Sequence, residues 1–170
     1  MLEMRGRARW ITGSAAVLVV ASVAVAFWLE GGGSDAPQVR ARQYTSSEAC
    51  LLTDDRGIAG RQAALVWAGM EDASLATHGK VSYLQVAGPA TVPNAIPYAN
   101  SLLQRHCDMV LGVGTAQAGA VAQVAQKASR ARFVVVGSGG GPARRNVTAV
   151  SLSADTRKEV AHVVEAALRR

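Results

Sequence analysis

The chain has 170 residues, of which 18% are charged, 49% are hydrophobic and 5% are aromatic. This composition is typical of a globular domain and excludes a disordered chain. The formal net charge is +6, but the basic residues are scattered, and aromatic residues are too few for a protein that stacks single-stranded bases. Two cysteines exclude a dense disulfide scaffold and a four-cysteine zinc site. We therefore expect one small domain with an extension, and no nucleic-acid partner.

The extension is predicted to cross a membrane, because residues 11–29 contain no charged side chain. A helix of this length is about 28 Å long, close to the roughly 30 Å of a hydrocarbon core. Three arginines lie in residues 1–10 and acidic residues follow the apolar segment. The positive-inside rule therefore predicts a single-pass protein with residues 1–10 in the cytoplasm and the C-terminal domain outside. Two alternatives are a cleaved signal peptide, which would make the protein secreted, and a buried helix of a soluble protein.

Residues 30–47 are polar and rich in glycine and serine, and they are predicted to form a flexible linker. Beyond it, residues 48–170 alternate between strand-like and helix-like patterns. In chain order we expect a strand at Ala49–Thr53, a helix at Arg61–Ala76, a strand at Lys80–Val86, a helix opened by Pro97, a strand at Met109–Val113, a helix at Ala116–Ser129 capped by Thr115, a strand at Arg132–Val136, a strand at Val147–Leu152, and a helix at Ala154–Leu168 capped by Ser153.

This alternation predicts an α/β fold with a single doubly wound, parallel five-stranded sheet and helices on both faces. We expect the strand order 2-1-3-4-5, which is a common doubly wound order. Met109–Val113 and Arg132–Val136 are almost continuously apolar, as expected for strands that are buried on both faces.

In such a sheet, ligands bind in the crevice formed by loops at the carboxyl ends of the strands. The candidate ligand-binding residues in these loops are Asp54, Asp55, Gly112, Gly114, Thr115 and Ser138. Asp54 could bind a ligand hydroxyl, or it could belong to a turn or cap a helix. Gly112 and Gly114 could let the backbone approach a ligand, or they could permit tight packing between strand and helix.

The sequence does not predict an enzyme. The turn at Gly112 and Gly114 lacks the last glycine of a dinucleotide-binding fingerprint, and residues 137–141 lack the lysine of a phosphate-binding loop. No nucleophile elbow is present. His78, His106 and His162 have no partner at metal-ligand spacing. We therefore expect no catalytic residues, no cofactor and no metal site.

Several segments resemble the basic membrane protein family, whose members are substrate-binding proteins of ABC importers, many of them nucleoside-binding lipoproteins. The similar segments are residues 50–58, 66–70, 107–114, 120–125 and 133–136, with a further likeness from residue 146 to the final helix. The resemblance covers roughly residues 48–168. It implies the first lobe of a type I periplasmic-binding protein, with an ABC permease as partner. The family has a second lobe, so a second lobe or a dimer partner would be needed to enclose a ligand.

The chain departs from the family where the ligand is bound. The family's Asp-Asp-Lys-Ser-Phe-Asn stretch falls on residues 59–64, so Ala63 replaces the base-stacking aromatic residue and Ala64 its polar neighbour. The family's acidic residue after the fourth strand falls on Gly137 or Ser138. The sequence therefore indicates a membrane-anchored, extracytoplasmic solute-binding-like domain with a degenerate site. The alternative is an extracytoplasmic interaction or sensory domain that binds no small molecule.

Cys50 opens the first predicted strand, and Cys107 stands just before the third. In the order 2-1-3-4-5 these strands are neighbours, about 4.8 Å apart, which is within the range a disulfide allows. An exported domain permits oxidation. We therefore predict a structural disulfide at the amino edge of the sheet, away from the crevice, with two buried free thiols as the alternative.

Overall fold

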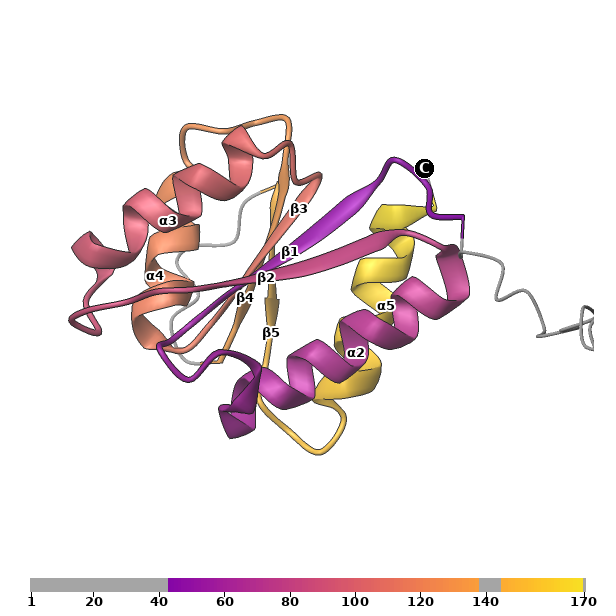
Figure 1. Ribbon diagram of the computed structural model, residues 1–170, viewed down its shortest axis with the longest axis horizontal. Helices are drawn as coiled ribbons and strands as arrows, with labels where there is room; N and C mark the ends of the chain where they lie inside the picture. The colour runs from indigo at the N-terminus through magenta and orange to yellow at the C-terminus, as the bar shows by residue number, and fades with distance from the viewer. Residues whose placement is uncertain (1–42, 138–144, 170) are drawn as a thin grey trace, which may run out of the picture. The chain divides into compact units, whose positions relative to one another are not determined.

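The structure is a computed structural model that describes residues 43–137 and 145–169 (Figure 1). It contains a five-stranded, all-parallel sheet of order β2-β1-β3-β4-β5, which confirms the predicted order and class. The strands are β1 Glu48–Thr53, β2 Lys80–Gln85, β3 Met109–Val113, β4 Arg132–Val136 and β5 Val147–Val150. The helices are the 3-10 turn η1 Gly57–Ala59 and α2 Arg61–Thr77, α3 Val92–Gln104, α4 Thr115–Val124 and α5 Thr156–Leu168.

The helices cover both faces of the sheet. In Figure 1, α3 and α4 lie on one side of the strands and α2 and α5 on the other. Successive side chains of a strand point to opposite faces, so the strands feed two cores. Leu51 and Leu111 pack with α2 and α5, whereas Leu52 and Phe133 pack with α3 and α4. Burial of β3 and β4 on both faces explains their almost uninterrupted apolar sequences.

Helix α3 begins five residues before the predicted start at Pro97. Thr91 is the N-cap, and its hydroxyl accepts a hydrogen bond from the Asn94 N–H at 3.4 Å. Pro93 occupies the first turn, where a missing N–H costs nothing. Pro97 lies inside the helix. Either Pro93 or Pro97 could occupy the first turn of the helix, and the N-cap at Thr91 places Pro93 there.

Both predicted N-caps, Thr115 and Ser153, are wrong. Helix α4 begins at Thr115 itself, after Gly114, and ends at Val124 rather than Ser129. Helix α5 begins at Thr156, and its N-cap is Asp155 rather than Ser153. The Ser153 hydroxyl accepts from the Asp155 N–H at 3.2 Å, so it forms a turn before the helix.

A disulfide joins Cys50 in β1 to Cys107 just before β3, with a Cα–Cα distance of 6.0 Å. Residue 107 follows α3 closely, so the bond ties the amino edge of the sheet to the α3–α4 side. No free cysteine is present among the described residues. The alternative of two free thiols is therefore wrong for this structure.

The predicted cytoplasmic segment 1–10 and transmembrane segment 11–29 lie outside the described residues, as does Ser138. Among the helices that the structure describes, none combines the length and the hydrophobicity needed to span a bilayer.

The last residues of the predicted linker are hydrogen-bonded to the domain. The Thr45 N–H donates to the His78 carbonyl at 2.8 Å, and the Ser47 carbonyl accepts from the Lys80 N–H at 2.9 Å.

Candidate functional site

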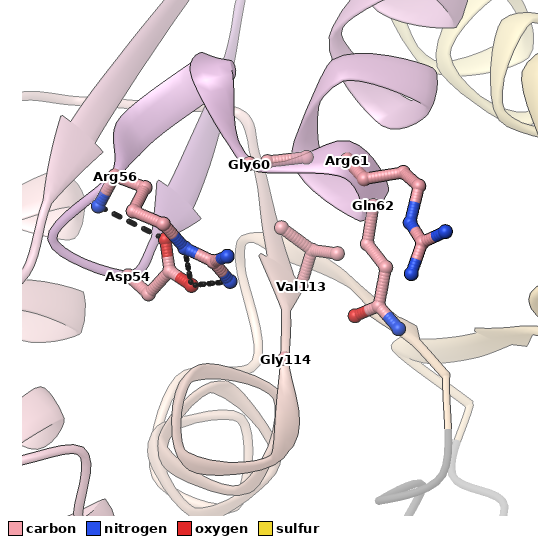
Figure 2. A pocket seen from close by; sticks show the side chains of 8 residues that line it. Asp54, Arg56, Gly60, Arg61, Gln62, Val113 and Gly114 are labelled. Atoms are coloured by element: carbon pink, nitrogen blue, oxygen red, sulfur yellow. Dashed lines mark hydrogen bonds and ion pairs between the residues drawn. The ribbon is translucent and has the colours of Figure 1, made fainter.

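A small cavity lies at the carboxyl edge of the sheet, where β1 and β3 end side by side. Its volume is about 190 Å³. Figure 2 shows its lining, with Val113 of β3 lying in this view between an Asp54–Arg56 pair and the first residues of α2. The lining residues are Asp54, Arg56, Gly60, Arg61, Gln62, Ala63, Val113 and Gly114. The topology therefore places a hollow where parallel α/β sheets bind ligands.

Asp54 is engaged by its own turn. Its Oδ1 accepts from the Arg56 N–H at 3.1 Å, and its Oδ2 accepts from Arg56 Nη2 at 2.9 Å and Nε at 3.3 Å. The hydrogen bond and the charge of Asp54 raise the pKa of Arg56 above its ordinary value. The carboxylate side chain is one-third exposed. Its charge and both its oxygens are thus already paired, which leaves little capacity for a ligand hydroxyl.

The amino ends of two helices, α2 and α4, border the cavity. Helix α2 begins after Gly60 and α4 begins after Gly114, and no side chain among the described residues caps either one. The first N–H groups of a helix carry partial positive charge. Gly114 has φ of +97°, a backbone conformation that favours glycine. Together with Arg61, these groups make the cavity net positive, because Arg56 neutralises Asp54.

The cavity is smaller than the pockets that typically enclose a ligand. Ligand pockets typically measure about 300–1,000 Å³ and bury most of the ligand surface. Ala63 lines the cavity and presents a methyl group where the resemblance implies a base-stacking aromatic ring. Ala64 is exposed and lies outside the lining. The described lining can therefore accept a small polar group, but it offers no aromatic platform.

The structure brings together two of the six predicted site residues. Asp54 and Gly114 line the cavity, whereas Asp55 and Thr115 are exposed and do not. Gly112 is buried under α4, and a Cβ there would lie 2.8 Å from the Gln117 carbonyl oxygen. Close packing of strand and helix accounts for Gly112, and its predicted contact with a ligand has no support in the lining. Ser138 lies outside the described residues.

Sequence reasoning missed Arg56, Arg61 and Gln62 as lining residues. A signal for them was present, because all three lie between the end of β1 and the first turn of α2. In parallel α/β sheets this connection borders the crevice. The sequence does not single out Arg56, because the pairing of its side chain with Asp54 depends on rotamers that the sequence does not specify.

Comparisons with known proteins support the fold. No family model and no curated protein matches the chain. A solved structure described as a "putative lipoprotein" fragment from Peptoclostridium difficile 630 has a TM-score of 0.62 and 14% identity, and the match covers 72% of this chain and 98% of that one. A "putative branched-chain amino acid ABC transporter" from Chromobacterium violaceum ATCC 12472 has a TM-score of 0.47 and 16% identity, over 63% of this chain and 35% of that one. The first likeness shows a shared fold, and the second is too weak to support an argument.

Proposed function

We propose that residues 48–170 form an extracytoplasmic solute-binding-like domain whose ligand site is degenerate, held at the membrane by residues 11–29. The observation that carries this proposal is the Asp54–Arg56 pair in the crevice. The crevice has the position of a ligand site, but its acidic side chain is occupied by a residue of the same turn. The relation to the basic membrane protein family and the ABC permease partner rest on the sequence resemblance.

The disulfide supports a location outside the cytoplasm. Disulfides persist in oxidising compartments and are rare where thiols are kept reduced. Cys50 and Cys107 are both buried, so their bond lies inside the folded domain and not in an exposed segment. The fold shared with a protein described as a lipoprotein is consistent with export.

A single lobe with this crevice should bind nucleosides weakly. One lobe leaves much of a ligand in water, whereas effective sites bury about 70–90% of its surface. The missing aromatic ring at Ala63 removes an interaction of about 1 kcal/mol, and a lost hydrogen bond removes about as much. Each 1.4 kcal/mol weakens binding about tenfold. We therefore expect dissociation constants in the millimolar range or weaker for the monomer.

Calorimetric titration of the full-length chain with a panel of nucleosides, combined with size measurement, tests the proposal. We expect no heat of binding at micromolar concentrations for the monomer, and binding only where a dimer or a partner covers the loops around Asp54 and Gly114. A monomer that binds a nucleoside at micromolar concentration would contradict the degenerate site.

The edge strand β2 favours a second candidate, an interaction or sensory domain. Among the described residues β2 pairs with β1 alone, and Tyr83 is 40% exposed beside Trp67, with ring centroids 5.4 Å apart. Amphipathic aromatic rings of this kind are enriched at protein interfaces. Genes for a permease and an ATPase beside this gene would favour solute binding, whereas a regulator or a sigma-factor-type system would favour this second candidate.

A further inference from the structure

A cluster of potential metal ligands lies at the amino edge of the sheet, opposite the crevice. A carboxylate oxygen of Glu48 and the sulfurs of Cys50 and Cys107 all lie within 4.8 Å of one another. Glu48 and Cys50 are two residues apart in β1, so their side chains point to the same face of the sheet. The two sulfurs are bonded to each other in this structure, so they are not free ligands.

We propose that reduction of this disulfide creates a binding site for a thiophilic divalent cation of the zinc type, with Glu48, Cys50 and Cys107 as ligands. Two thiolates and one carboxylate are ligands that Zn²⁺ accepts, and three protein ligands leave the fourth tetrahedral position to water. The disulfide and the metal exclude each other because they use the same two sulfurs. The site is therefore available in only one redox state.

The spacing of the carboxylate already suits such a site. Bonds of about 2.3 Å to sulfur and about 2.1 Å to oxygen place tetrahedral ligands roughly 3.5–3.8 Å apart. The Cys50 Sγ lies 3.6 Å from Glu48 Oε1, and this contact is not a hydrogen bond because the bonded sulfur carries no proton. Once the disulfide is broken, the two sulfurs can separate to a similar distance by rotating about χ1.

The neighbouring strand holds the carboxylate in place. The Ser82 hydroxyl donates to Glu48 Oε1 at 2.6 Å, and Ser82 stands opposite Cys50 in the β1–β2 register. The Glu48 N–H donates to Asp108 Oδ2 at 2.9 Å, which fixes the backbone beside the segment that carries Cys107. Partners of this kind orient ligands and contribute to metal affinity.

Solvent can reach this edge of the molecule. Cys107 lines a cavity of about 480 Å³ together with His106, Asp108 and Lys127. Glu48 is half-buried rather than enclosed. The cavity therefore brings solvent to the Cys107 side of the cluster, whereas Cys50 is fully buried and does not line the cavity.

The chemistry balances as follows. A trialkylphosphine breaks the S–S bond and is oxidised to its phosphine oxide, with the oxygen taken from water, and the cysteines gain two hydrogens as thiols. Each thiol then loses its proton to solvent as its sulfur binds the cation. Binding of one divalent ion therefore releases two protons.

Cobalt titration of the full-length chain tests the site, because tetrahedral thiolate–Co²⁺ has a sulfur-to-metal charge-transfer band. We expect no band for the oxidised protein. After reduction and anaerobic removal of the phosphine, we expect one Co²⁺ per chain, displacement by Zn²⁺, release of two protons and a higher melting temperature. Circular dichroism reports whether the reduced chain is folded.

Matched variants separate this site from nonspecific thiol binding. Glu48→Gln should weaken Co²⁺ binding at least about tenfold, and Ser82→Ala should weaken it less, as outer partners typically do. Glu71→Gln, which changes an exposed carboxylate of α2, should leave affinity unchanged. A reduced chain without a one-to-one complex would overturn the proposal, and so would binding only to unfolded chain or equal affinity of the Glu48→Gln variant and the unaltered protein.

Discussion

Arg157 of α5 reaches α2, where its Nε and Nη2 donate to the two carboxylate oxygens of Asp72 at 2.6 and 2.8 Å. The hydrogen bond from Arg157 lowers the pKa of Asp72 below its ordinary value. Burial opposes this with a smaller effect, and the charge of Arg157 adds a still smaller lowering. Both side chains are more than one-third exposed, so solvent and salt screen the pair. Its contribution to stability is therefore small, but it depends on pH.

We expect Asp72→Asn to lower the melting temperature slightly at neutral pH and to have no effect in strong acid. The folded state holds the Asp72 pKa below its unfolded value of about 3.9, so the stabilisation is complete above that value and is lost as pH falls through the lower, folded pKa. Thermal melts across this range measure the difference. Asp55→Asn is the control, because Asp55 is exposed and forms no ion pair with the described residues. A difference that persists unchanged in acid would contradict this account.

At the level of single residues, the sequence predicted where the crevice residues lie better than which contacts they make. Asp54 and Gly114 follow strands whose apolar patterns are easy to recognise, so their position at the carboxyl edge could be derived. The neutralisation of Asp54 by Arg56 could not, because it depends on side-chain geometry within one turn. The sequence pattern also does not distinguish Gly112 from Gly114. In the structure Gly112 packs against α4, whereas Gly114 lines the cavity.

At the scale of elements, the packing of α2 on α5 depends on Gly69. A Cβ at this position would lie 2.5 Å from the Arg157 carbonyl oxygen and 3.0 Å from the Val160 Cβ. The nearest atom belongs to helix backbone, so it cannot move aside as the end of a side chain can. The absence of a side chain therefore sets how closely the two helices approach.

We expect Gly69→Ala to destabilise the domain by about 1–3 kcal/mol, the usual cost of forcing extra volume into a packed core, less a gain of under about 1 kcal/mol in helix propensity. Gly60→Ala is a matched control, because a Cβ there meets its neighbours at 3.5 Å or more and φ is −65°. Because Gly60 is the N-cap of α2, where alanine is less favourable than glycine, this variant should cost about 0.5–1 kcal/mol. Urea unfolding measures both, and equal effects of the two variants would show that α2 and α5 can separate without cost.

Element types could be predicted more reliably than element ends. Strands β3 and β4 have the predicted bounds because their apolar runs stop abruptly at polar or glycine residues. The start of α3 was wrong because both Pro93 and Pro97 can occupy a first helical turn, and only the contact of Thr91 with Asn94 distinguishes them. Helix α4 ends early at Val124, after which Asn146 Nδ2 donates to the carbonyls of Ala125 and Ala128 at 3.1 and 3.0 Å. A contact with a residue so far along the chain cannot be read from local sequence.

At the scale of the whole molecule, the alternation of strands and helices was sufficient to predict the sheet. Right-handed crossovers and two covered faces leave few arrangements for five parallel strands. The predicted order makes β1 and β3 neighbours, so the sequence alone places Cys50 and Cys107 within bonding reach. Whether one lobe suffices for binding depends on the volume and lining of the crevice, which follow from packing and not from topology.

The disulfide should be the largest single covalent contribution to the stability of this domain. It closes a loop of 57 residues in the unfolded chain, and the loop-entropy model assigns about 4 kcal/mol to a loop of that length. We expect the double variant Cys50→Ala, Cys107→Ala to lose about 2–4 kcal/mol, because the small cavities left by the sulfurs add to the loss while residual structure in the unfolded chain reduces it.

Guanidinium unfolding in the presence of a chelator measures this loss, and the chelator keeps metal binding from restabilising the reduced protein. The unaltered chain in a phosphine reductant is the matched control, since it lacks the same bond but keeps both sulfurs. The two should agree within about 1 kcal/mol, and both should unfold with a larger denaturant dependence than the oxidised chain, because an uncrosslinked unfolded state exposes more surface. If the free energy of unfolding falls by less than about 1 kcal/mol in both the double variant and the reduced chain, the unfolded chain already keeps β1 and β3 close together. The disulfide would then add little constraint to the unfolded state.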